Sequence, residues 1–145
     1  MKAMRPVFVV AATTVLAAYS QQSAVAAHPA PRASTATTRQ VMLAMTVPTS
    51  NAVFAAGGEA PKDDAGWALV EANAVILAES AQLLKTGARV VDQKDWLKLS
   101  DALISAAEGA AHAAHEKNAD KLSASSDAVY QTCEDCHKQY LIPKS

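Results

Sequence analysis

Apolar side chains recur at steps of three and four residues along most of the chain, the spacing of one face of an α-helix. The clearest stretch starts at a cap formed by Asp63 or Asp64, runs to Lys85 and ends at Gly87, a typical C-terminal stop. It predicts a helix of more than five turns with one apolar face. The apolar positions of this face are Trp67, Val70, Ala74, Leu77, Ala81 and Leu84.

Two further stretches repeat this spacing, one opening with Asp92 as a cap candidate and one covering about 119–141. A fourth stretch, about 37–56, is less regular because it contains Pro48, and a proline removes one intrahelical hydrogen bond. We expect a kink or a restart of that helix near Thr49 and Ser50. The two regular stripes are Trp96, Leu99, Leu103, Ala106, Ala110 and Ala113, and Leu122, Ser126, Val129, Cys133, Cys136 and Tyr140.

Three breaks, at 57–64, 87–92 and 117–120, separate the four helical segments. The third break is so short that its flanking helices must be antiparallel neighbours. Composition agrees: 50% of the residues are apolar, but only 5% are aromatic and five are glycine, which argues against a β-sandwich or barrel. The sequence therefore predicts an all-α protein, an antiparallel up-down-up-down four-helix bundle.

The first residues have the pattern of a secretory signal. Lys2 and Arg5 precede an apolar run over 7–19 that is shorter than the roughly 20 residues needed to span a bilayer. Small residues that end at Ala26 or at Ala27 are acceptable to signal peptidase, which would cleave after one of them. The alternative interpretation of the segment is an uncleaved membrane anchor. We expect a cleaved signal over 1–27, a flexible lead-in over 28–36 and a bundle domain over 37–145. The mature protein would be periplasmic, without stable membrane insertion.

Charge and residue clustering exclude several classes of function. The formal net charge is -1 and no cluster of Lys or Arg exists, so a nucleic-acid binder is not expected. No carboxylate pair or Ser/His constellation gathers outside the C-terminal motif, so an enzyme is not expected either.

The chemistry-bearing motif is Cys133-Glu134-Asp135-Cys136-His137, a C-x-x-C-H sequence typical of covalent haem c attachment. Two thiols three residues apart can each bond one vinyl group at the same porphyrin edge. The adjacent imidazole then reaches the iron from one side. On a helix, positions i, i+3 and i+4 share one face, here the face of the apolar stripe. The motif predicts one haem c, bound through Cys133 and Cys136 with His137 as an iron ligand.

Three other interpretations of the cysteine pair remain. A thioredoxin-like redox pair needs alternating strands and helices, which the chain does not show. A C-x-x-C disulfide would close a very small loop and stabilise little. A zinc site would need a fourth ligand besides Cys133, Cys136 and His137.

Bundle topology narrows the choice of the residue that would bind the iron on the side opposite His137. The haem would lie at one end of the bundle, with the start of the first helix, the end of the second and the start of the third. His112 and His115 fall at the opposite pole, and His28 lies in the lead-in. Met42 and Met45 lie at the haem end, and a thioether is a known haem ligand. We expect Met42 as the ligand, with Met45 or an open site as alternatives.

The chain resembles the class II c-type cytochromes, cytochrome c′ and its low-spin Met-ligated relatives. The shared marks are four helices, a C-x-x-C-H close to the C-terminus, an aromatic residue three positions after the His (Tyr140), and a Trp opening the third helix (Trp96). The resemblance covers the mature chain. It implies a single-electron carrier with Met42 on the distal side of the iron.

The resemblance also implies details of the site and of the partners. Relatives often carry an Arg four residues before the distal position, near a haem propionate; here Arg39 lies three before Met42, and Thr38 four before. Cytochrome c′ itself keeps a five-coordinate iron that binds NO or CO, which is the alternative function. Relatives pass electrons to redox partner proteins and are commonly homodimers through their first two helices.

Apolar side chains near the haem follow from the same geometry, and we expect protein without haem to be unstable. A bundle that binds no haem, and serves as an interaction module, is the remaining class. The side chains expected to line the haem or pack beside it are Leu83, Leu84, Trp96, Leu99, Leu103 and Val129.

Overall fold

The computed structural model describes residues 34–141, which are helical throughout apart from turns and short connections, and contain no strand. The expected signal, 1–27, and most of the lead-in fall outside these residues. A continuous first helix consists of α1 (Thr38–Val41), a π-helical turn η1 (Met42–Thr46) and α2 (Val47–Gly58). It is followed by α3 (Asp64–Leu84), a short 3-10 turn η2 (Gly87–Arg89), α4 (Asp95–His115) and α5 (Ala119–Tyr140). The predicted all-helical class is confirmed.

Side-chain caps begin the long helices where the sequence indicated. Asp63 accepts a hydrogen bond from the Gly66 amide at 2.8 Å and begins α3. Asp92 accepts from the amides of Lys94, Asp95 and Trp96, and so caps α4 although it lies three residues before its first residue. These carboxylates satisfy amides that have no partner within the helix.

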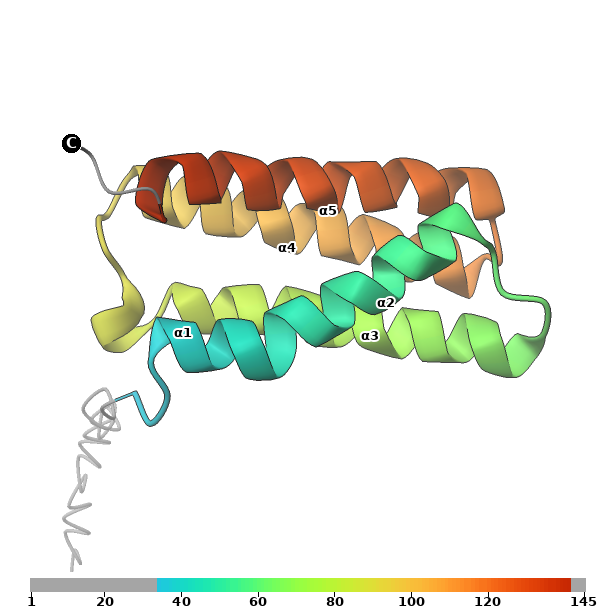
Figure 1. Ribbon diagram of the computed structural model, residues 1–145, viewed down its shortest axis with the longest axis horizontal. Coiled ribbons are helices and arrows are strands. Elements are labelled where there is room, and N and C mark those ends of the chain that lie inside the picture. The colour runs from blue at the N-terminus through green and yellow to red at the C-terminus, as the bar shows by residue number, and fades with distance from the viewer. Residues whose placement is uncertain (1–33, 142–145) are drawn as a thin grey trace, which may run out of the picture.

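The four helices pack as a bundle in which α3 contacts α4, α4 contacts α5, and α2 contacts both α3 and α5 (Figure 1). The first helix crosses the bundle obliquely: α1 and η1 lie along α3, and α2 rises to reach α5 (Figure 1). Gly57 marks the close approach, since a Cβ there would lie 2.5 Å from that of Ser126. The first helix therefore meets α5 at one end of the bundle and diverges from it at the other.

Pro48 does not break the first helix where it was predicted to. The helix continues through Thr49 and Ser50, and its irregularity is η1, on the N-terminal side of the proline. The prediction of a kink near Thr49 and Ser50 was wrong because a proline ring disturbs the carbonyl four residues before it, not the turn that follows.

The apolar interior consists of two clusters. The larger is built on the predicted stripe of α3, on the alanine-rich face of α4 and on Leu122 and Val129 of α5. The smaller contains Val41, Leu84 and Trp96, with Met42 and Tyr140 packed against it. Both clusters exclude water, but they are separate, and the space between them lies at the end of the bundle where the first helix diverges from α5.

The stretch Thr38–Gly58 is apolar and long enough to cross a membrane by length and composition alone. A core helix of a folded bundle passes the same test. Here Val53 and Ala56 pack in the larger cluster, and Val41 packs in the smaller one.

Arg89 in η2 is buried, with 7% of its surface exposed, and no carboxylate within residues 34–141 pairs with it. Its guanidinium donates to the carbonyls of Leu83 and Ala36, the latter at 2.8 Å, and to the Thr86 hydroxyl. Sequence reasoning missed this residue, which joins the start of the first helix to the α3–α4 connection.

We expect Arg89→Ala to destabilise the protein by about 2 kcal/mol, since a charged donor to buried acceptors contributes roughly 1.5–3 kcal/mol. The loss should appear as a lower midpoint in urea unfolding and as faster amide exchange in α1. Lys98→Ala, which removes an exposed cation from α4, is the control and should leave the midpoint within error. Equal midpoints for both variants would contradict the role of Arg89.

Candidate functional site: a cavity between the two apolar clusters

The cavity at the divergent end of the bundle is lined by residues of every long helix. Its interior volume is about 50 Å³, and it opens to solvent at its mouth. Its walls are mainly apolar, with a few polar groups, as is typical of ligand-binding sites. The lining residues are Met42, Thr46, Val47, Ser50, Leu84, Leu99, Ser100, Leu103, Thr132, Cys133, Cys136 and His137.

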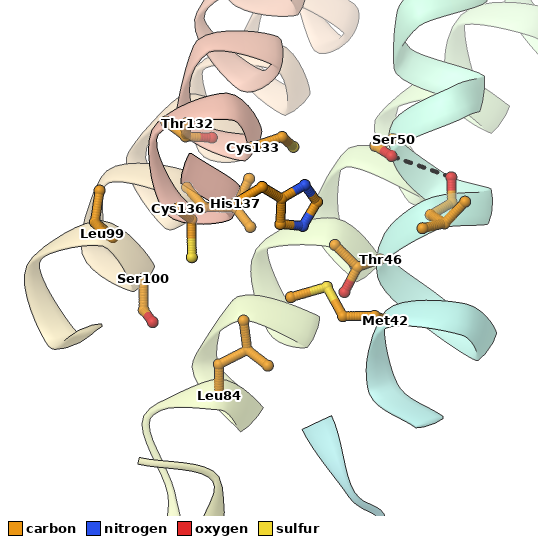
Figure 2. Close-up of a pocket in the computed structure, with 12 residues that line it drawn as sticks. Met42, Thr46, Ser50, Leu84, Leu99, Ser100, Thr132, Cys133, Cys136 and His137 are labelled. Atoms are coloured by element: carbon orange, nitrogen blue, oxygen red, sulfur yellow. Dashed lines mark hydrogen bonds between the residues drawn. The ribbon is translucent and has the colours of Figure 1, made fainter. Parts of the chain in front are cut away.

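The end of α5 forms one wall. Cys133, Cys136 and His137 lie at i, i+3 and i+4 and line the same cavity, as a helix dictates (Figure 2). The His137 ring reaches across the cavity toward the first helix (Figure 2). The fully buried stripe of α5 ends at Val129, and from Cys133 onward its residues are half-buried or exposed. The motif thus sits where α5 loses its packing partners.

The two cysteines are free thiols. Burial raises the pKa of the Cys133 thiol, and the hydrogen bond with Thr132 offsets part of this rise. Burial also raises the pKa of the Cys136 thiol, and the neighbouring Cys133 adds to it. Both groups are therefore protonated at neutral pH, unlike the activated thiolates of redox-active cysteine pairs.

Met42 of η1 forms the facing wall. Its side chain extends from the first helix into the space below the His137 ring (Figure 2). Met45, the alternative, lines an open groove on the outer side with Leu43 and Leu83 and does not line the cavity. The structure therefore brings Met42, and not Met45, together with the C-x-x-C-H motif.

The other predicted residues divide into lining, supporting and remote groups. Leu84, Leu99 and Leu103 line the cavity, whereas Val129 is buried one turn away in the larger cluster. Leu83 was predicted to lie at the site, but it is 37% exposed on the outer groove. Adjacent helix positions are about 100° apart, so only one of Leu83 and Leu84 can face inward.

Trp96 and Tyr140 support the site from behind. Trp96 is 4% exposed, donates its indole N–H to the Leu84 carbonyl at 2.8 Å and packs edge-on against Tyr140. Neither residue lines the cavity. Arg39 is exposed on α1 and is not among the lining residues. His112 and His115 lie at the far end of α4 with exposed side chains, and His115 contacts Glu71 near the start of α3.

Four hydroxyls of the cavity wall were not predicted: Thr46, Ser50, Ser100 and Thr132. Three of them turn back on their own helices, since Ser50, Ser100 and Thr132 donate to the carbonyls of Val47, Trp96 and Val129. Ser50 and Ser100 each lie one helical turn after a residue that faces the interior. A serine at such a position does not by itself indicate a binding site in the sequence.

The last turn of α5 is tied to the start of α4. The Tyr140 hydroxyl donates to Asp92, the same carboxylate that caps α4. This hydrogen bond lowers the pKa of Asp92 to about 2, from an ordinary value of 3.8. Burial, followed by the bond to Asp92, raises the pKa of Tyr140 to about 12, from 10.0. The contact holds the helix that carries the motif against the smaller apolar cluster.

We expect Tyr140→Phe to lower the melting temperature by an amount that depends on pH. A carboxyl with a lowered folded-state pKa stabilises above its unfolded value and loses that effect as pH falls from about 4 to 2. A phenol with a raised pKa stabilises below 10 and loses that effect between about 10 and 12. The difference from wild type should therefore be constant between about pH 4 and 10 and shrink on both sides. Tyr130→Phe is the control, because Tyr130 is exposed and its hydroxyl donates to Glu134 of its own helix.

The residues fit a flat, mostly apolar macrocycle with a metal at its centre. Apolar side chains form the walls, two protonated thiols lie on one side, and an imidazole and a thioether approach from opposite helices. The cavity volume of about 50 Å³ is smaller than a macrocycle, so the lining side chains would have to move apart to admit such a group. Elsewhere in residues 34–141, no group of three His, Cys, Asp or Glu side chains is arranged to hold a metal ion.

These assignments rest on the residues of this chain alone, because no protein-family model, no curated protein and no solved structure matches it.

Proposed function

We propose that this protein is a periplasmic c-type cytochrome that carries one covalent haem c and transfers single electrons. In the proposed architecture, an antiparallel up-down-up-down bundle holds the haem near one end, with His137 as the proximal and Met42 as the distal iron ligand. The observation that carries the proposal is the cavity in which Cys133, Cys136 and His137 of α5 meet Met42 of η1 between two apolar clusters.

Seven of the residues that line the cavity have a part in this proposal. Cys133 and Cys136 would each form one thioether bond, their S–H adding across a vinyl group of the macrocycle. His137 and Met42 would hold the iron from opposite sides. Bound haem iron would supply reversible one-electron oxidation and reduction. Leu84, Leu99 and Leu103 exclude water, and this dry, apolar wall together with a thioether ligand favours a raised reduction potential.

Two measurements on the mature protein test this function. The protein should be produced with its export signal in a host that attaches haem c, and its intact mass should exceed that of the polypeptide by one haem. The oxidised absorption spectrum should be low-spin, with the weak far-red band of a Met–Fe(III) bond. A colourless chain of unmodified mass from such a host would overturn the proposal.

A high-spin oxidised spectrum with covalent haem present would select the alternative function. The distal position would then be open, and the protein would bind NO or CO like cytochrome c′. Met42 at the cavity favours the electron carrier over this alternative.

We also propose redox partner proteins and a second copy of this chain as partners. Leu69, Ile76 and Leu83 of α3 recur every seven residues and are 65%, 43% and 37% exposed, beside the outer grooves that α3 forms with the first helix. Such an apolar stripe is the surface that an association through the first two helices would bury.

We expect Ile76→Glu to shift sedimentation from dimer to monomer without altering the absorption spectrum. Ala102→Glu, an exposed position of α4, is the matched control. A monomeric wild-type protein at high concentration would exclude the dimer.

A further inference from the structure

The first helix contains one residue more than an uninterrupted α-helix would place in the turn at η1. The Val47 amide donates to the Met42 carbonyl, five residues back, where an α-helix would bond four residues back. A π-turn of this kind is frequent at functional sites. Because each helical residue turns the chain by about 100°, the extra residue rotates everything before it by about that angle relative to α2.

This rotation decides which side chain faces His137. Thr46, Val47 and Ser50 of the first helix line the cavity. In an uninterrupted α-helix, the residue that continues their face one turn earlier is Leu43, four positions before Val47. With the extra residue, Met42 takes that place and lines the cavity, whereas Leu43 is 56% exposed.

Two features keep the extra residue in the turn. Pro48 has no amide hydrogen, so the Ala44 carbonyl cannot receive the bond that an α-helix would form there. The Thr46 and Ser80 hydroxyls lie 2.9 Å apart in the interior, with exposures of 4% and 0%. Ser80 also donates to the Leu77 carbonyl of its own helix at 2.7 Å. The contact between Thr46 and Ser80 therefore ties η1 to α3.

The anchoring side chains on both sides of η1 fix the rotation. Before the turn, Val41 is 2% exposed and packs in the smaller cluster with Leu84 and Trp96. After it, Thr46 is held by Ser80. Straightening the helix would turn one of these two buried residues toward solvent, so both resist the change.

We propose that η1 is a register device: the extra residue presents the thioether of Met42, instead of the Leu43 side chain, to the site that His137 faces. Thr46, Pro48 and Ser80 are then positioning residues that act through the helix and not through contact with the iron. This inference rests on the proposed function for its ligand, but its geometry concerns only which of two adjacent residues faces the cavity.

Two variants of the haem-loaded protein test whether the rotation of the helix at η1 decides which residue faces the cavity. In Met42→Leu/Leu43→Met the side chains are exchanged, and we expect complete loss of the Met–Fe(III) band together with a lower reduction potential. Deletion of Ala44, an exposed residue, removes the extra residue without moving Met42 off the cavity face, and should keep both the band and the potential. A retained band in the exchange variant, or a lost band in a folded deletion variant, would overturn the proposal.

A third measurement does not depend on iron. Met42→Cys and Leu43→Cys are made singly, and the rate of maleimide labelling at each position is followed by peptide mass spectrometry. We expect position 43 to react at least tenfold faster than position 42. Equal rates, or a faster reaction at 42, would overturn the register. If wild type carries no haem, labelled Cys133 and Cys136 would reveal the failure of the proposed function, while the ratio at 42 and 43 still tests the inference.

Discussion

Met42→Ala is expected to convert the oxidised iron from six-coordinate low-spin to five-coordinate high-spin. Among the residues that line the cavity, Met42 is the one side chain outside α5 that carries a strong ligand atom for haem iron. The remaining polar groups of the first helix are the Thr46 and Ser50 hydroxyls, which are already bonded to Ser80 and Val47. Nothing in the wall therefore replaces the thioether.

Three readouts should change together in this variant. The far-red Met–Fe(III) band disappears, the reduced protein gains the ability to bind CO, and the reduction potential falls. We expect a fall on the order of 0.1 V or more, a fraction of the roughly 0.8 V over which axial ligands tune haem. Potentiometric titration and the two absorption spectra measure these changes.

Met45→Ala is the matched control, because Met45 lies three residues away on the same helix but lines the outer groove. It should leave spectrum and potential as in wild type. If Met42→Ala leaves the spectrum unchanged while Met45→Ala alters it, the assignment of the distal ligand is reversed. If neither variant has an effect, methionine does not bind the iron.

Replacing both cysteines is expected to cause the largest loss of stability. Cys133→Ala/Cys136→Ala would remove both proposed covalent links, and the space between the two apolar clusters would then lack the proposed macrocycle. Several leucine-sized groups face that space, and burial contributes about 25 cal/mol per Å² of apolar surface. The free energy of unfolding should fall by on the order of 5 kcal/mol, which in a domain of this size corresponds to on the order of 20 °C in melting temperature.

The two tryptophans report where the loss occurs. Trp96 belongs to the smaller cluster beside the cavity, and Trp67 to the larger cluster at the far end. In the double variant we expect the near-ultraviolet circular dichroism of Trp96 to weaken while that of Trp67 persists, with Trp96→Phe and Trp67→Phe used to assign the signals. The single variants Cys133→Ala and Cys136→Ala keep one link each and should lie between. A double variant as stable as wild type would favour the bundle that needs no haem.

The helical interior was predictable because each side chain of the α3 stripe repeats at helical spacing. Trp67, Val70, Ala74, Leu77, Ala81 and Leu84 are all buried. The same spacing could not decide between Met42 and Met45, because a π-turn changes which residues share a face. Pro48 indicated that the helix was irregular, but the periodicity did not indicate on which side.

Contacts between residues far apart in the chain could not be predicted, because they leave no pattern in the sequence. Arg89 resembles any surface arginine in a turn, and its burial depends on carbonyls of Leu83 and Ala36 that meet only in the folded bundle. Likewise Asp92 was recognisable as a helix cap, but its bond to Tyr140 joins residues 48 positions apart. The motif therefore allowed the candidate site to be located from the sequence, whereas the contacts that support it could not be predicted.

The close approach at Gly57 has a consequence for the order of assembly. There α2 is pressed against Ser126 of α5, so these two helices are joined at the end of the bundle away from His137. The half of the protein around Trp67 and Leu122 is fully packed without any contribution from the cavity. We therefore expect the end of the bundle around Gly57 to fold first, and the cavity to accept the proposed haem afterwards.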